Sequence, residues 1–118
     1  MTIKHYHLLY YAKVEEEKTK LQLNQFFKGI LNELNMQCLI KPQLAFSHLK
    51  AWTGIMGITT SHISFHYWTK ENYVQVDIYS CKEFDKQHAR QYLDKFWKAK
   101  NSKAIFINRD KGFNIKYM

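Results

Sequence analysis

Four polar side chains that could do chemistry lie in one short stretch of the sequence: Ser61, His62, His66 and Cys81. A serine hydroxyl can act as a nucleophile, an imidazole can move protons near neutral pH, and a thiol can do either. Taken alone, the group is also typical of ordinary strand serines and histidines and of a small apolar thiol. It lacks a compact pair of zinc ligands, and Ser61 lies outside a GxSxG nucleophile turn, so we predict neither a metal site nor that type of hydrolase.

The pattern around these residues predicts two neighbouring strands. Residues 63–68 and 74–79 each alternate apolar and polar side chains, and the polar segment 69–72 between them is typical of a hairpin loop. Such a hairpin places Cys81 toward the Ser61 end of the pair. We therefore expect a serine, a histidine and a thiol to meet at one end of a sheet.

The rest of the chain predicts the elements that must position this hairpin. Two amphipathic helices and several further strands alternate along the sequence, which favours an α+β fold with a mostly antiparallel sheet and both helices on one face. We expect a two-layer α/β sandwich and a single domain over residues 1–118. The expected elements are a strand at Ile3–Ala12, a helix near 15–35, extended segments at 36–46 and 52–58, a helix at 86–99 capped by Asp85, a strand at 104–108 and a turn at 109–112.

Composition narrows the class of protein. The chain has 118 residues and a formal charge of +8, which favours anionic partners, but no nucleic-acid-binding motif accompanies the charge. Nucleic-acid binding is therefore only a third hypothesis. No apolar run is long enough to cross a bilayer, and the first residues do not resemble a signal peptide. We expect a cytoplasmic protein in which Cys38 and Cys81 are free thiols.

Two spaced segments resemble one enzyme family. Thr60–Trp68 (TSHISFHYW) is similar to the ESHxSIHTW signature of prokaryotic S-adenosylmethionine decarboxylases, and Val76–Cys81 (VDIYSC) is similar to their VDVFTC segment. The spacing agrees too, since the family's histidine follows its serine by five residues and its cysteine follows by twenty, as His66 and Cys81 follow Ser61 here.

The resemblance implies a self-made cofactor. In that family the serine attacks the preceding carbonyl, the chain is cut by β-elimination, and a pyruvoyl group remains at the new N-terminus. Carried over, Ser61 is the pyruvoyl precursor, Thr60 ends the small fragment, and His66 is the processing base. Thr53 could hydrogen-bond the oxygen intermediate, and Cys81 would protonate the α-carbon, a task that suits a thiol because its pKa can be brought near neutrality.

The resemblance also implies an activity. The pyruvoyl ketone would form a Schiff base with the amine of a small amino-acid substrate and withdraw electrons during decarboxylation. S-adenosylmethionine, in polyamine biosynthesis, is the default substrate, and a related amino acid is the other possibility. We expect a homodimer with active sites at its interface. The alternative is an unprocessed, non-catalytic homologue that acts as a binding protein.

The positions implied to hold substrate depart from the family. Trp68 ends the first motif and is kept. Lys70 replaces a glutamate expected to bind the ribose, and a charged lysine cannot accept a hydrogen bond from a hydroxyl. Glu71 is next in sequence, and Phe46 lies one residue from the family's adenine-stacking aromatic. Thr60 replaces the glutamate before the serine. The processing residues are thus kept, while the nucleoside-binding ones are altered.

Overall fold

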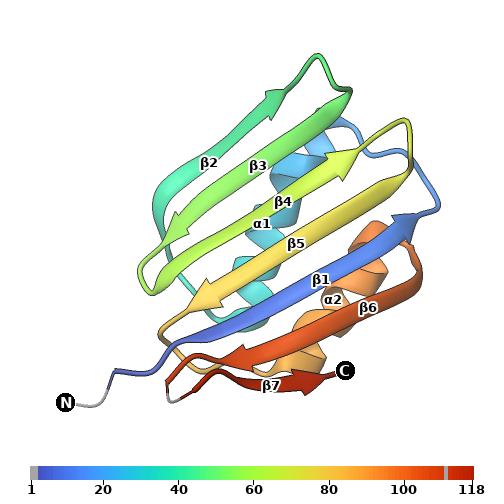
Figure 1. The fold of residues 1–118 in the computed structure, drawn as a ribbon. Helices are drawn as coiled ribbons and strands as arrows, with labels where there is room; N and C mark the ends of the chain where they lie inside the picture. Colours follow the sequence, from blue (N-terminus) through green and yellow to red (C-terminus); the bar gives the residue numbers. More distant parts are fainter. Residues whose placement is uncertain (1–2, 111) are drawn as a thin grey trace.

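The computed structural model describes residues 3–110 and 112–118 (Figure 1). Its strands form one seven-stranded sheet in the order β2-β3-β4-β5-β1-β6-β7, and every pair of neighbouring strands is antiparallel. The elements are β1 (Tyr6–Val14), α1 (Lys20–Leu34), β2 (Cys38–Phe46), β3 (Ala51–Ile58), β4 (Ser61–Trp68), β5 (Tyr73–Ser80), α2 (Lys86–Trp97), β6 (Ala99–Asn108) and β7 (Asn114–Tyr117).

Both helices cover the same face of the sheet, and no described helix lies on the other face (Figure 1). This confirms the predicted α+β fold, a two-layer sandwich with helices on one face of an antiparallel sheet. The predicted hairpin register is also confirmed, because Phe65 pairs with Val76 and Trp68 pairs with Tyr73. Within the described residues, no helix is both long and apolar enough to span a membrane.

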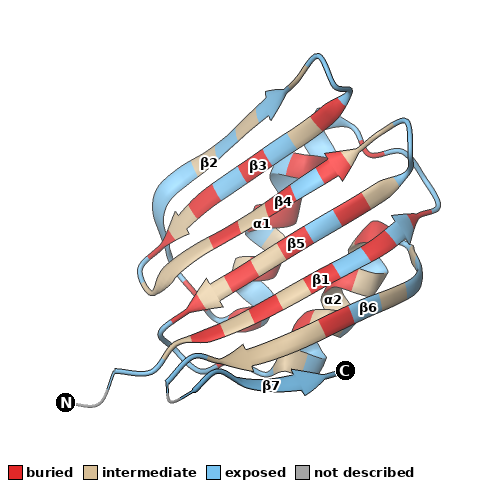
Figure 2. Ribbon diagram, viewed as in Figure 1, coloured by how far each residue is buried: buried red, intermediate tan, exposed pale blue. Residues whose placement is uncertain are grey.

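The core lies between the sheet and the helices. In the central strands β1, β4 and β5, alternate residues are buried there, including Ile63, Phe65 and Tyr67 of β4 (Figure 2). This alternation follows from the strand geometry, which points successive side chains to opposite faces. The helices contribute their predicted stripes, with Phe26 fully buried on α1 and Trp97 fully buried on α2, their rings 5.5 Å apart.

Helix α1 begins later than its acidic residues suggested. Glu15–Glu17 precede the helix, which starts at Lys20. The start is set by a capping box, in which the Thr19 hydroxyl accepts a hydrogen bond from the Gln22 amide while the Gln22 side chain accepts one from the Thr19 amide. Two satisfied backbone donors outweigh the favourable helix-dipole energy of exposed acidic residues, which is a few tenths of a kcal/mol to about 1 kcal/mol each.

The C-terminal part also differs from the prediction. Strand β6 begins at Ala99, five residues before the predicted start at Ala104, and a short edge strand, β7, was not predicted. All four residues of β7 are exposed, so they carry no apolar alternation from which a strand could be recognised. The predicted turn at 109–112 includes Lys111, which lies outside the described residues.

Candidate functional site

Ser61 lies at a tight turn between β3 and β4. It pairs with Ile58, so the hairpin loop contains only Thr59 and Thr60. Loops of two residues usually need positive φ angles within the loop, which β-branched residues resist. Here Ser61 has a positive φ of 155°, a conformation that residues with a side chain rarely adopt and that costs on the order of 1–3 kcal/mol. The peptide bond between Thr60 and Ser61 therefore lies at a strained point of the backbone.

The carbonyl of Thr60 is held by Cys81. The backbone N–H of Cys81 donates to this oxygen at 2.9 Å, and the pairing of Ser61 with Ser80 places the two segments side by side. A donor at a carbonyl oxygen polarises the carbonyl and stabilises negative charge that develops there. The Cys81 thiol itself is free and exposed, so it does not point into the apolar core.

The side chain of Thr60 is also fixed, by a contact that the sequence did not predict. The hydroxyl of Ser80, which is fully buried, donates to Thr60 Oγ1 at 2.8 Å and accepts the Lys82 backbone N–H at 3.0 Å. Lys82 Nζ in turn donates to the carbonyl of Asn35, at the end of α1, at 2.8 Å. Thr60 is thus anchored at the position where the family that this sequence resembles has a glutamate.

Within one chain, the structure does not bring His66 to Ser61. His66 lies five residues further along β4, roughly 16 Å away at the usual rise of a strand. It is exposed on the face without helices, whereas Ser61 has the parity of the buried residues Ile63 and Phe65. The sequence contained a signal for this separation. His66 follows Ser61 by five residues, and two residues an odd number apart on a strand point to opposite faces.

Thr53 accompanies His66 and not Ser61. The two residues are directly paired across β3 and β4. Together with Ser64, Gln75 and Asp77 they line a shallow cavity of about 280 Å³ on the open face. Thr53 therefore has no contact with the Thr60–Ser61 bond of its own chain.

The expected substrate-binding residues lie at the end of the sheet opposite Ser61. The Trp68 ring makes an edge contact with His66, with centroids 5.6 Å apart. Phe46 is half-exposed, and its ring lies 5.0 Å from the Trp52 ring in a tilted arrangement. Lys70 and Glu71 are exposed in the β4–β5 turn. Both turns at this end are joined, since the Thr69 amide and hydroxyl both donate to the Lys50 carbonyl.

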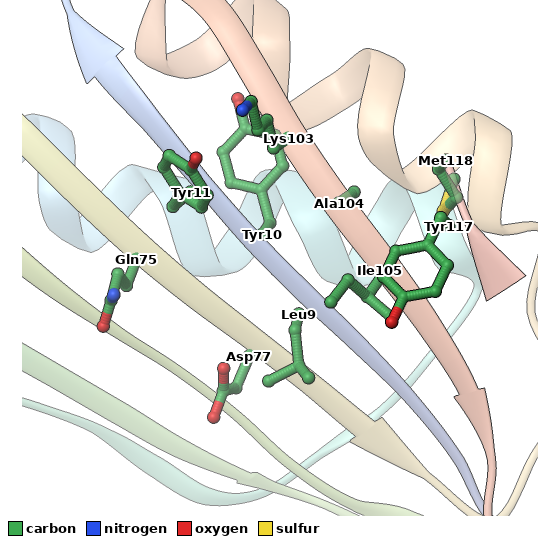
Figure 3. A pocket seen from close by; sticks show the side chains of 10 residues that line it. All are labelled: Leu9, Tyr10, Tyr11, Gln75, Asp77, Lys103, Ala104, Ile105, Tyr117 and Met118. Atoms are coloured by element: carbon green, nitrogen blue, oxygen red, sulfur yellow. The ribbon is translucent and has the colours of Figure 1, made fainter. Parts of the chain in front are cut away.

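The open face holds a second, larger hollow over β5, β1, β6 and β7 (Figure 3). Its volume is about 490 Å³ and its walls are mainly apolar. Gln75 and Asp77 line both hollows, so the two adjoin across the middle of the sheet. The second hollow is lined by Leu9, Tyr10, Tyr11, Gln75, Asp77, Lys103, Ala104, Ile105, Tyr117 and Met118.

Comparison with known proteins agrees with the motifs and the fold. The sequence profile of the S-adenosylmethionine decarboxylase family matches residues 8–110, which include both motifs. The chain belongs to the S-adenosylmethionine decarboxylase family. An S-adenosylmethionine decarboxylase proenzyme of Clostridium botulinum is 26% identical over 92 residues, which cover 75% of this chain and 78% of that protein.

Two further comparisons agree with this assignment. The proenzyme of Pyrococcus furiosus is 37% identical over 58 residues, 48% of this chain and 42% of that protein. The crystal structure of the adenosylmethionine decarboxylase from Aquifex aeolicus has the same fold, with a TM-score of 0.73 over 89% of this chain and 88% of that one, at 20% identity. The family and its fold are therefore established for this chain, as a divergent member.

Proposed function

We propose that this chain is a decarboxylase proenzyme that cuts itself between Thr60 and Ser61 and then acts on S-adenosylmethionine, or on a related amino acid, in polyamine biosynthesis. When present, the pyruvoyl group derived from Ser61 supplies an electron-withdrawing ketone for decarboxylation. The residues fit its formation, because the Ser61 hydroxyl adjoins a peptide bond at a strained point of the backbone, and the carbonyl oxygen of that bond accepts the Cys81 N–H. That arrangement is the observation that carries the proposal.

We further propose that each active site is built from two copies of the chain. Ser61, Thr60 and Cys81 lie at one end of β4, while Thr53, His66 and Trp68 lie toward its other end. One chain alone therefore holds two half-sites that cannot meet. A symmetric dimer brings the Ser61 end of one copy to the His66 end of its partner, and symmetry creates the second site at the same time.

The exposed apolar residues on the open face of the sheet support a dimer in which a second copy of the chain covers this face. The face exposes apolar side chains that none of the described helices and strands covers, including Ile55 and Tyr117, which are 49% and 78% exposed. If Ser61 of each copy faces His66 of the other, the two-fold axis crosses β4 halfway between them, near Ser64. Ser64 lies on the open face and lines the cavity that contains His66.

In this arrangement the residues of the two half-sites have distinct roles. Cys81 lies beside the cleavage point and would deliver a proton to the substrate. In the proposed cytoplasmic location its thiol would stay reduced. His66 of the other copy would remove the Ser61 α-hydrogen during cleavage, with Thr53 at its side. Trp68, Phe46, Lys70 and Glu71 would line the substrate end, where Lys70 disfavours a ribose hydroxyl because it offers a donor in place of an acceptor.

A mixed-dimer experiment tests the proposal. Ser61→Ala chains and His66→Ala chains are each expected to stay uncleaved. When the two are mixed in equal amounts, half of the dimers are hybrids and each hybrid keeps one intact site, so about one quarter of the sites should process. Intact-mass analysis measures the two fragments that meet between Thr60 and Ser61.

The same experiment has clear negative outcomes. No recovery in the mixture, although the parent chain cleaves, would show that each site is built within one chain. A parent chain that remains intact after long incubation would remove the pyruvoyl function altogether. Ser64→Arg serves as a control, because a charged side chain at the proposed axis should give monomers that do not process while the core stays unchanged.

The alternative function is a non-catalytic homologue that binds a ligand without cleavage. The observation that favours it is the replacement of family glutamates by Thr60 and Lys70. In that case Ser61, His66 and Cys81 are remnants of an ancestral site. The parent chain then stays intact in the mass spectrum, and the open-face hollows remain its binding surface.

A further inference from the structure

We propose that His62, and not His66, is the base that starts self-cleavage by taking the proton of the Ser61 hydroxyl. This inference rests on the proposed function and divides the processing between two imidazoles. His62 acts first, in the attack of Ser61 on the Thr60 carbonyl. His66 acts afterwards, on the Ser61 α-hydrogen.

The first observation is the position of the His62 ring. Its Nδ1 atom lies 3.4 Å from Ser61 Oγ, while His66 of the same chain lies roughly 16 Å along the strand. Neighbouring side chains on a regular strand point to opposite faces and do not meet. The contact occurs where the Ser61 backbone departs from strand geometry, at a φ of 155°. Hydrogen bonds of a catalytic base are often long before reaction and tighten in the transition state.

The second observation is that the ring of His62 is held in place from the neighbouring strand. Tyr79 of β5 pairs with His62, and their rings are 5.2 Å apart. Tyr79 is itself covered by His5, stacked in parallel at 5.2 Å, and by the Arg109 guanidinium at 4.7 Å. A packed support of this kind limits the ring to few orientations and keeps Nδ1 near the hydroxyl.

These groups complete a reaction that needs no external reactant. The Ser61 hydroxyl proton passes to His62 Nδ1 as Oγ forms a bond with the Thr60 carbonyl carbon. The resulting oxyanion is stabilised by the Cys81 N–H, which already donates to that oxygen at 2.9 Å. The carbon–nitrogen bond then breaks, the nitrogen takes the proton back from His62, and Thr60 becomes an ester of the Ser61 oxygen with a free amine on Ser61.

Hydroxylamine, which cleaves esters and leaves amides intact, tests the assignment. The His66→Ala protein should stop at the ester, so hydroxylamine should release a fragment that begins with an unmodified Ser61. The His62→Ala/His66→Ala protein should form this ester at least about a hundredfold more slowly, the usual lower range for loss of a general base. His62→Asn in the same background keeps a polar side chain without a base, and it should be as slow as the alanine variant.

Added imidazole distinguishes a base from a structural residue. It should restore part of the ester formation in His62→Ala/His66→Ala, because the His62 side chain is only half-buried and its removal leaves space open to solvent. Equal rates of ester formation in His66→Ala and His62→Ala/His66→Ala would overturn the assignment. A slow double variant would also overturn it if added imidazole did not raise its rate while its thermal unfolding matched that of the parent. If neither the parent chain nor His66→Ala ever yields fragments or ester, the proposed function fails, and this inference fails with it.

Discussion

Removal of the Ser80 hydroxyl should both destabilise the chain and slow its cleavage. Ser80 is fully buried, and its hydroxyl makes two hydrogen bonds, one to Thr60 and one from the Lys82 amide. Ser80→Ala leaves two polar groups without these partners. Both groups lie close enough to the surface to be partly hydrated, so we expect the free energy of unfolding to fall by about 1–3 kcal/mol in total. For a chain of this length, that corresponds to a melting temperature lower by roughly 4–12 °C.

The measurement needs an uncleaved chain, so Ser80→Ala is compared with its parent in a Ser61→Ala background by urea and thermal unfolding. Ser64→Ala, on the open face of the neighbouring strand, is the matched control and should change the free energy by less than about 0.5 kcal/mol. In chains that keep Ser61, Ser80→Ala should also slow fragment formation, because Thr60 loses its anchor. Unchanged stability together with unchanged cleavage would refute the role of this hydroxyl.

Gly54→Ala should lower the free energy of unfolding by about 1–3 kcal/mol in urea titrations. The reason is that the added Cβ would lie 2.5 Å from the buried Phe65 ring. A smaller loss of stability would mean that the ring can move. Burial, with a smaller contribution from a nearby acidic side chain, raises the pKa of Tyr92 to about 12. The unfolded chain loses this proton near pH 10, so stability should fall as the pH rises from about 10 to about 12, and Tyr92→Phe should flatten that fall in alkaline melting curves. Lys70→Glu should tighten binding of an S-adenosylmethionine analogue by about ten- to a hundredfold in calorimetry. If the parent already binds the analogue tightly and only Glu71→Ala loses that binding, this role of Lys70 is wrong.

The family, the fold class and the hairpin register could all be predicted from the residues alone. Two motifs at fixed spacing indicated the family, and alternation along residues 63–68 and 74–79 predicted the strand pair with Cys81 at the Ser61 end. These features are local, because alternation, helical stripes and turn residues are written in consecutive positions. The start of α1 was predicted too early. The Thr19 capping box competes with the acidic residues before it, and the helix begins where more backbone donors are satisfied.

The division of the candidate site between the two ends of the sheet could not be predicted from the residues, because it depends on the folded backbone. Motif spacing groups Ser61, His66 and Cys81, but the strand separates Ser61 from His66 by length and by face. The anchoring of Thr60 by Ser80, and the contact of His62 with Ser61, depend on a two-residue turn and on one strained φ angle. These contacts form only when the backbone angles and the strand pairing bring the two side chains together, and residue types alone do not specify those angles.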